Sequence, residues 1–142
     1  MLEESNESKV LIVGGDAAKL MAISQLLTQY NLSSSQARDA QEAIKLMKKR
    51  IKNSRALPMF SLIICDYSTQ DFYGFQCMQE ISAMLENNAQ KLIKMPFMCC
   101  LTAYSAKKFS AETMREQGYL VVSKADFVEQ LPSILEKSGL LA

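Results

Sequence analysis

Three polar residues of different chemistry each follow a short apolar run of the sequence, and together they could carry out phosphoryl chemistry. Asp66 directly follows the run at residues 60–65, and Thr102 directly follows the run at 96–101. Lys124 follows a third apolar run after a single serine. A carboxylate is a nucleophile that can form an acyl phosphate, and a hydroxyl can donate a hydrogen bond to a phosphoryl oxygen. An ammonium group is a compact charge that offsets the phosphoryl dianion.

The elements that must bring these residues together alternate between strand and helix patterns. Five segments have the composition of strands, four of them continuously apolar and the second serine-rich: 9–13, 32–37, 60–65, 96–101 and 119–122. Four segments between them show apolar residues at helical spacing: 20–30, 43–51, 75–85 and 106–117. A last helix contains the apolar residues near the C-terminus. Continuous apolar runs are typical of strands buried on both faces, and strands separated by helices imply right-handed crossovers. The pattern therefore predicts an α/β fold with a doubly wound, five-stranded parallel sheet and helices on both faces.

The end of the first strand contributes Gly14, Gly15 and Asp16 to the same edge of the sheet. Ligands of an open parallel sheet bind outside the carboxyl ends of its strands. Neither G-x-G-x-x-G nor G-x-x-x-x-G-K-[ST] is present, so the glycine pair favours a tight turn over a nucleotide-binding loop. Asp16 is a candidate N-cap of the following helix.

Length and composition set the broad class of the protein. A chain of 142 residues, of which 49% are hydrophobic and 22% charged, fits one globular domain. The net charge of +1 gives no global attraction to nucleic acid or to an anionic membrane. The basic run at residues 45–55, which includes Arg50, predicts a solvated helix face. The first residues lack the pattern of a signal peptide and no run could span a membrane, so we expect a cytoplasmic protein.

Histidine and cysteine usage restricts the chemistry further. The chain has no histidine, which excludes a Ser-His-Asp or Cys-His catalytic unit and every histidine metal site. Any phosphohistidine must therefore come from another molecule or domain. The four cysteines contain no Cys-x-x-Cys pair, which favours reduced, buried thiols over a zinc site.

The order and spacing of the polar residues resemble the receiver domain of two-component response regulators. The matching residues are Asp66, Gly74 eight positions later, Thr102 with the alanine after it, and Lys124, and the resemblance covers residues 9–138. It implies a flavodoxin-like sheet of strand order 2-1-3-4-5. It also implies Asp66 as the phosphoacceptor, Thr102 as a phosphoryl ligand and switch residue, and Lys124 as the cation that contacts the phosphoryl group.

The sequence departs from the receiver pattern at the magnesium site. Typical receivers carry an acidic pair directly after the first strand, and this pair positions Mg²⁺; here Gly14 and Gly15 stand in those places. The resemblance leaves Asp66 and the main-chain carbonyl of Ser68 as metal ligands. Asp16, one position further on, serves either as a displaced ligand or only as a helix cap. We therefore expect Mg²⁺ to bind weakly or not at all.

Loss of the acidic pair has a second consequence at the phosphoacceptor. Without the two negative charges, we expect Asp66 to form a direct ion pair with Lys124. Two further positions also differ from the family. Ala125 follows the lysine where a proline is usual, and the aromatic switch position matches Val121. Tyr119 lies two residues away from that position, and we do not assign it a switch role.

Two classes of function remain open at this point. In the first, the domain accepts a phosphoryl group on Asp66 from a partner's phosphohistidine and relays a conformational signal. In the second, it is a pseudo-receiver, a protein-binding module that works without phosphorylation. Both classes imply protein partners, namely a histidine kinase or phosphotransfer protein and an output protein or domain, but no nucleic acid, membrane or small-molecule substrate. Neither is an enzyme beyond self-catalysed phosphoryl acceptance and slow autodephosphorylation. The resemblance places the output face on the fourth helix, fifth strand and fifth helix.

The boundaries of the domain follow from the same patterns. Residues 1–8 are polar and acidic and are expected to form a flexible tail, residues 9–138 the receiver-like domain, and residues 139–142 a C-terminal tail. The start of the last helix is not fixed by the sequence, because Pro132 is expected not to fit inside a helix.

Overall fold

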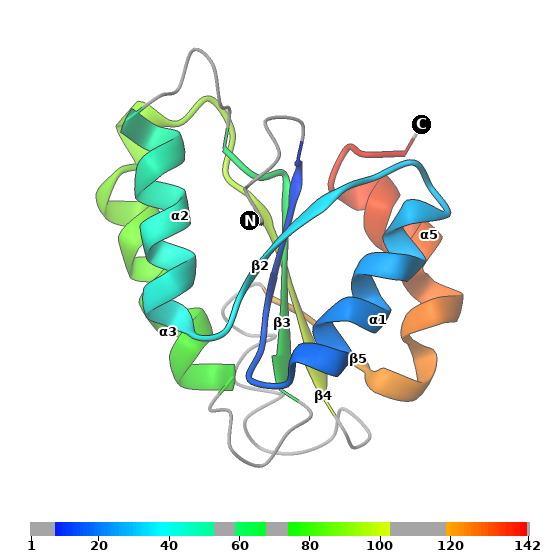
Figure 1. Ribbon diagram of the computed structural model, residues 1–142. Coiled ribbons are helices and arrows are strands. Elements are labelled where there is room, and N and C mark those ends of the chain that lie inside the picture. Colours follow the sequence, from blue (N-terminus) through cyan, green and yellow to red (C-terminus); the bar gives the residue numbers. More distant parts are fainter. Residues whose placement is uncertain (1–7, 53–58, 68–73, 103–118, 142) are drawn as a thin grey trace.

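The computed structural model describes residues 8–52, 59–67, 74–102 and 119–141, which contain a five-stranded sheet and the helices that cover it (Figure 1). The elements in chain order are β1 (Val10–Val13), α1 (Ala17–Thr28), β2 (Ser34–Ala37), α2 (Ala40–Lys52), β3 (Leu62–Tyr67), α3 (Gly74–Asn87), the 3₁₀ turn η1 (Ala89–Lys91), β4 (Phe97–Thr102), β5 (Leu120–Ser123), the 3₁₀ turn η2 (Lys124–Asp126) and α5 (Phe127–Lys137). The helix predicted at residues 106–117 lies outside the described residues.

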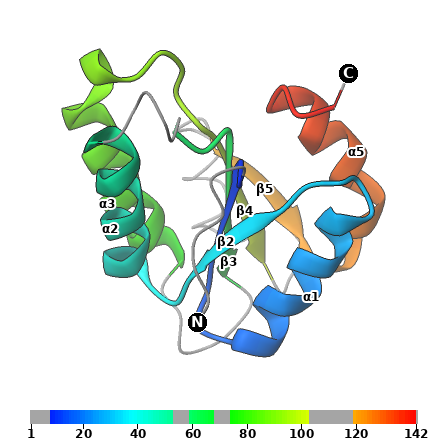
Figure 2. The ribbon, with the colours of Figure 1, turned by 45° about the horizontal axis from the view of Figure 1, so that its top comes forward.

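The sheet is entirely parallel, and its strand order is β2-β1-β3-β4-β5. Helices α2 and α3 cover one face and α1 and α5 cover the other, as two views of the ribbon show (Figures 1 and 2). The predicted doubly wound fold and its order are therefore confirmed. The serine-rich strand β2 lies at one edge of the sheet, where its outer side has no neighbouring strand, and its apolar pattern is the weakest of the five.

Alternate residues of the central strands enter two separate apolar layers. In β3, Ile63 and Cys65 pack with α2 and α3, whereas Leu62 and Ile64 pack with α1 and α5. The strand is buried on both faces, so its sequence is apolar without alternation. None of the helices in the described ranges is long and apolar enough to cross a membrane.

Helix α5 corrects the expectation about Pro132, which lies inside the helix. Proline removes one helical hydrogen bond, the bond to the carbonyl four residues earlier, which belongs to Val128. Both residues are exposed on the outer face of α5, so water can bind that carbonyl instead. The buried face of the helix is formed by other residues: Phe127, Leu131, Ile134 and Leu135.

Both ends of the described chain pack against the core. Ser8, at the end of the predicted N-terminal tail, is buried, and its hydroxyl accepts a hydrogen bond from Ser35 at 3.0 Å. Beyond α5, the amide of Leu140 donates to the carbonyl of Leu135 at 2.8 Å, and the side chains of Leu140 and Leu141 pack on the layer beneath α1 and α5. The described core therefore includes Ser8 at one end and Leu140 and Leu141 at the other.

Arg50 corrects the prediction that the basic run of α2 is solvated along its whole length. Its side chain is 1% exposed and stacks on the ring of Phe60, with 4.0 Å between the guanidinium carbon and the ring centroid. The guanidinium also donates to the carbonyl of Ser8 at 2.9 Å. The cation–π contact and the charged hydrogen bond offset its desolvation. Its neighbours Lys48 and Lys49 are exposed as predicted.

Truncation of Arg50 should be strongly destabilising. We expect Arg50→Ala to lower the free energy of unfolding by about 2–4 kcal/mol, because it removes buried partners of Phe60 and of the Ser8 carbonyl. The exposed neighbour provides the control, and Lys48→Ala should change stability by less than about 0.5 kcal/mol. Urea unfolding of the two variants measures both values. Equal free energies of unfolding for Arg50→Ala and Lys48→Ala would contradict the structural role of Arg50.

All four cysteines are buried, free thiols, as the sequence predicts. Burial raises the pKa of the Cys99 thiol to about 12, and burial also raises the pKa values of Cys65 and Cys100. A raised pKa keeps a thiol protonated and therefore unreactive at neutral pH.

The raised pKa of Cys99 predicts a loss of stability in alkali. The folded chain holds the proton of this thiol up to about pH 12, whereas the unfolded chain releases it near pH 9. Between these values the folded state binds more protons, so the free energy of unfolding falls as the pH rises. Cys99→Ala should reduce that slope by up to about 1.4 kcal/mol per pH unit. Urea unfolding from pH 8.5 to 11 measures the slope, and identical slopes in both proteins would refute the assignment.

Candidate functional site

Asp66 and Lys124, which are 58 positions apart in the chain, meet at the carboxyl edge of the sheet. The ammonium nitrogen Nζ of Lys124 lies 3.0 Å from Oδ2 of Asp66 and donates a hydrogen bond to it. The Asp66 side chain is 2% exposed and that of Lys124 is 34% exposed, so the pair is partly shielded from solvent. The predicted resting ion pair between these two residues is therefore confirmed.

The elements on either side explain why the pair forms. Asp66 is the penultimate residue of β3, a strand between β1 and β4. Lys124 opens η2 directly after β5, and the turn is fixed by Ser123, whose hydroxyl accepts from the amide of Asp126 at 3.3 Å and donates to its carboxylate at 2.9 Å. We did not single out Ser123 from the sequence, although Ser-x-x-Asp is a capping pattern that could have drawn attention to it.

Thr102 ends β4 at the same edge of the sheet and is 8% exposed. In the parallel register it is the partner of Ser123, the residue before Lys124. The residue before it, Leu101, is the register partner of Asp66. The strand ends thus bring Thr102 to the edge that carries the ion pair, while its contact with a phosphoryl group remains a prediction.

Gly14 lies directly against the phosphoacceptor candidate. A Cβ atom added at Gly14 would lie 3.2 Å from Cβ of Asp66 and 3.0 Å from Cδ2 of Leu20. Both distances are shorter than ordinary carbon–carbon contacts of about 3.5–4.0 Å. Any side chain at this position, including an acidic one, would require its neighbours to move.

Asp16, the displaced metal candidate, caps helix α1. Its Oδ1 atom accepts from the amides of Ala18 at 2.9 Å and Lys19 at 3.3 Å. This is the geometry of an N-cap, in which the side chain satisfies amides that have no helical partner. Of the two predicted roles of Asp16, the structure therefore supports that of a helix cap.

The described residues do not form a typical magnesium site. Gly14 and Gly15 supply no carboxylate, Asp16 caps a helix, and Asp66 is bound to an ammonium group. Within the ranges that the structure describes, no three His, Cys, Asp or Glu side chains are grouped so that they could hold a metal ion. Ser68, the predicted carbonyl ligand, lies outside those ranges.

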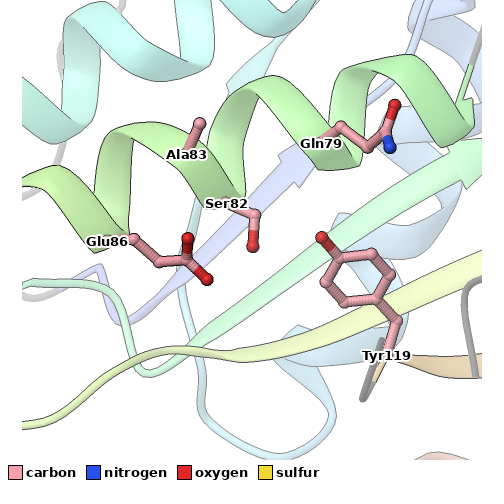
Figure 3. A pocket seen from close by; sticks show the side chains of 5 residues that line it. All are labelled: Gln79, Ser82, Ala83, Glu86 and Tyr119. Atoms are coloured by element: carbon pink, nitrogen blue, oxygen red, sulfur yellow. The ribbon is translucent and has the colours of Figure 1, made fainter. Parts of the chain in front are cut away.

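Tyr119 lies on the side of the sheet that α3 covers, away from the ion pair. Its hydroxyl points toward α3 (Figure 3) and donates to the carbonyl of Met78 at 3.5 Å. The ring borders a hollow of about 410 Å³ that α3 lines with Gln79, Ser82, Ala83 and Glu86. Val121 is buried in the same layer. Tyr119 thus helps to join the start of β5 to α3.

Several solved structures similar to this chain are receiver domains. The receiver domain of the histidine kinase CKI1 from Arabidopsis thaliana, complexed with Mg²⁺ and BeF₃⁻, superposes with a TM-score of 0.72 and 14% identity over 93% of this chain and 89% of that chain. A CheY-like response regulator receiver domain from Methylobacillus flagellatus gives a TM-score of 0.69 and 15% identity over 92% and 98%. The N-terminal domain of an uncharacterized protein from Wolinella succinogenes gives 0.66 and 19% over 93% and 94%.

These similarities define the class of fold. No protein-family model matches the sequence, and no curated protein sequence matches it. At identities below 20%, the structural likeness establishes the fold, which is that of a CheY-like receiver domain. What the residues of this fold do in this chain has to be argued from the site itself.

The close approach of Gly14 to Asp66 predicts a steric penalty for any side chain there. We expect Gly14→Ala to lower the free energy of unfolding by about 1–3 kcal/mol, because the added carbon overpacks the contact with Asp66 and Leu20. Gly15→Ala is the matched control, since Gly15 is exposed, and its effect should stay within about 0.5 kcal/mol. Urea unfolding compares them, and a Gly14→Ala protein as stable as Gly15→Ala would show that the contact is not tight.

Proposed function

We propose that residues 9–138 form a receiver domain of a two-component or phosphorelay system, and that Asp66 accepts a phosphoryl group from a phosphohistidine of a partner protein. The observation that carries this proposal is the 3.0 Å contact between Lys124 and Asp66 at the carboxyl edge of a receiver-type sheet. A buried carboxylate paired with an ammonium group at a ligand-binding edge is suited to nucleophilic chemistry on an anionic donor.

The reaction follows from the chemistry of these side chains. A carboxylate oxygen of Asp66 forms a bond to phosphorus while the bond between phosphorus and the donor imidazole nitrogen breaks. The imidazole leaves with the electron pair of that bond and takes up a proton. Lys124 offsets the added negative charge as it stays beside the acyl phosphate, and Thr102 donates its hydroxyl to a phosphoryl oxygen. No step is assigned to Mg²⁺, because the described residues do not fit a typical magnesium site.

The partners of such a domain are proteins. The donor is a histidine kinase or a phosphotransfer protein, since this chain has no histidine of its own. The recipient of the signal is an output protein or domain. We place this function in the cytoplasm and describe the chain as a signalling phosphoprotein rather than an enzyme, beyond phosphoryl acceptance and slow autodephosphorylation.

A second candidate function is favoured by one specific observation, the replacement of the acidic pair by Gly14 and Gly15. A carboxylate of Asp66 already neutralised by Lys124 needs no divalent cation. A pseudo-receiver would use the ion pair only to hold β3 and η2 together and would bind its partner without phosphorylation. Retention of Asp66, Thr102 and Lys124 together favours the phosphoacceptor over this alternative.

Incubation with acetyl phosphate and Mg²⁺, followed by intact-mass analysis, separates the two functions. The receiver proposal predicts one phosphoryl adduct on the wild-type chain and none on Asp66→Asn. Lys124→Met should reduce the adduct strongly, by about tenfold or more if the lost charge contact contributes 1.4 kcal/mol. Asp16→Asn should keep it, because an asparagine still caps a helix.

A cognate phosphohistidine donor, used when acetyl phosphate gives no adduct, completes the test. Absence of an adduct with both donors would overturn the phosphoacceptor function and support the pseudo-receiver. An adduct on Asp66→Asn that equals the wild-type level would place the modified residue elsewhere.

A further inference from the structure

A groove of about 260 Å³ lies at the amino edge of the sheet, opposite the edge that carries Asp66. It is bounded by the end of α2, by the residues that lead into β3, and by the connection from η1 to β4, which meet at the upper edge of the sheet in Figure 1. Its apolar lining consists of Ile51, Met59, Leu92 and Ile93. The site of the proposed phosphoryl chemistry contributes no residue to this lining.

The groove combines exposed apolar surface with positive charge. Ile93 is fully exposed, at 106% of its reference area, and Met95 two residues later is 42% exposed. Lys91 and Lys94 line the same groove, together with the buried guanidinium of Arg50. None of its lining residues in the described part of the chain is acidic. An acidic peptide segment with a large apolar side chain would match both features.

The chain itself reaches this groove from its N-terminal side. The carbonyl of Ser8 accepts a hydrogen bond from Arg50 at 2.9 Å, and the carbonyl of Lys9 accepts one from the amide of Ser61 at 2.8 Å. Both donors line the groove. Val10 is the register partner of Leu62, so Ser8 and Lys9 run beside the residues that lead into β3, of which Met59 and Ser61 line the groove.

We propose that residues 1–7 of this chain bind in this groove, with their glutamates paired to Lys91 and Lys94 and Leu2 on the apolar surface around Ile93. The segment carries three glutamates, Glu3, Glu4 and Glu7, and no basic residue. Seven residues span up to about 23 Å when extended, which is enough to cross a groove of this size.

Weak contacts are sufficient for this binding because the segment is tethered. Each exposed ion pair contributes only about 0–1 kcal/mol. Ser8 is buried and fixed, however, so the segment is held at a high effective concentration beside its site. The contact should also be sensitive to salt, because the lysines are exposed and the Debye length falls to about 3 Å near 1 M salt. A bound N-terminal segment would compete with any acidic partner for this edge of the domain.

Zero-length cross-linking of the full chain tests the proposal. A carbodiimide joins a glutamate carboxylate to a lysine amine as an amide, with loss of one water, and peptide mass spectrometry locates the bond. We expect links from Glu3, Glu4 or Glu7 to Lys91 or Lys94 to be several-fold more frequent than links to Lys52. Lys52 ends α2, is exposed and does not line the groove. High salt should remove the preference.

A matched pair of variants tests the apolar part of the contact. Ile93→Ser should reduce the links to Lys91 and Lys94 several-fold, whereas Val128→Ser, at another exposed apolar residue on α5, should leave them unchanged. A mixture of ¹⁴N- and ¹⁵N-labelled chains shows whether a link lies within one chain. No preference over Lys52, no effect of Ile93→Ser, or links mainly between two chains would each overturn the proposal. Because the groove and Asp66 lie at opposite edges, none of these outcomes bears on phosphoryl transfer.

Discussion

The ion pair between Asp66 and Lys124 is the interaction on which the carboxyl edge of this domain depends. A carboxylate that is 2% exposed needs a compensating charge, and the ammonium group of Lys124 lies 3.0 Å from it. The contact joins β3 to the turn after β5, two elements with β4 between them. It therefore fixes the edge at which open parallel sheets bind their ligands, and it places a carboxylate next to a cation there.

The glycines after β1 allow this arrangement. Gly14 approaches Asp66 so closely that a side chain there would crowd the carboxylate and Leu20. An intact acidic pair would add negative charge beside Asp66, and such charges call for a divalent cation. With glycine in both places, one lysine is sufficient to balance the charge of Asp66. The two glycines thus leave room for the ion pair at this edge of the sheet.

The sequence was sufficient to predict the fold and the ion pair, because both follow from repeated or topologically fixed features. Buried parallel strands have continuous apolar sequences, which made the strands recognisable. The carboxyl ends of parallel strands lie at one edge of the sheet, so the proximity of Asp66 and Lys124 could be predicted from the sequence. The environments of Arg50 and Pro132 were predicted wrongly. The charge of a residue and its helix propensity indicate only where such residues lie on average. Arg50 is buried because its guanidinium stacks on Phe60 and donates to the Ser8 carbonyl. Pro132 is tolerated because it lies on the exposed face of its helix. The sequence allowed Asp16 to be either a metal ligand or a helix cap, and the hydrogen bonds from the amides of α1 to its carboxylate support the cap.

A double-mutant cycle between Asp66→Asn and Lys124→Met measures how strongly the two side chains are coupled. Urea unfolding of the wild type, both single variants and the double variant gives the coupling free energy of the pair, with and without Mg²⁺. A partly buried pair should give a coupling of about 1–2 kcal/mol. If Lys124 organises Asp66, the coupling free energy is the same in the presence of Mg²⁺. A coupling below about 0.5 kcal/mol, or one that Mg²⁺ abolishes while stabilising the wild type, would show that a cation and not Lys124 organises Asp66.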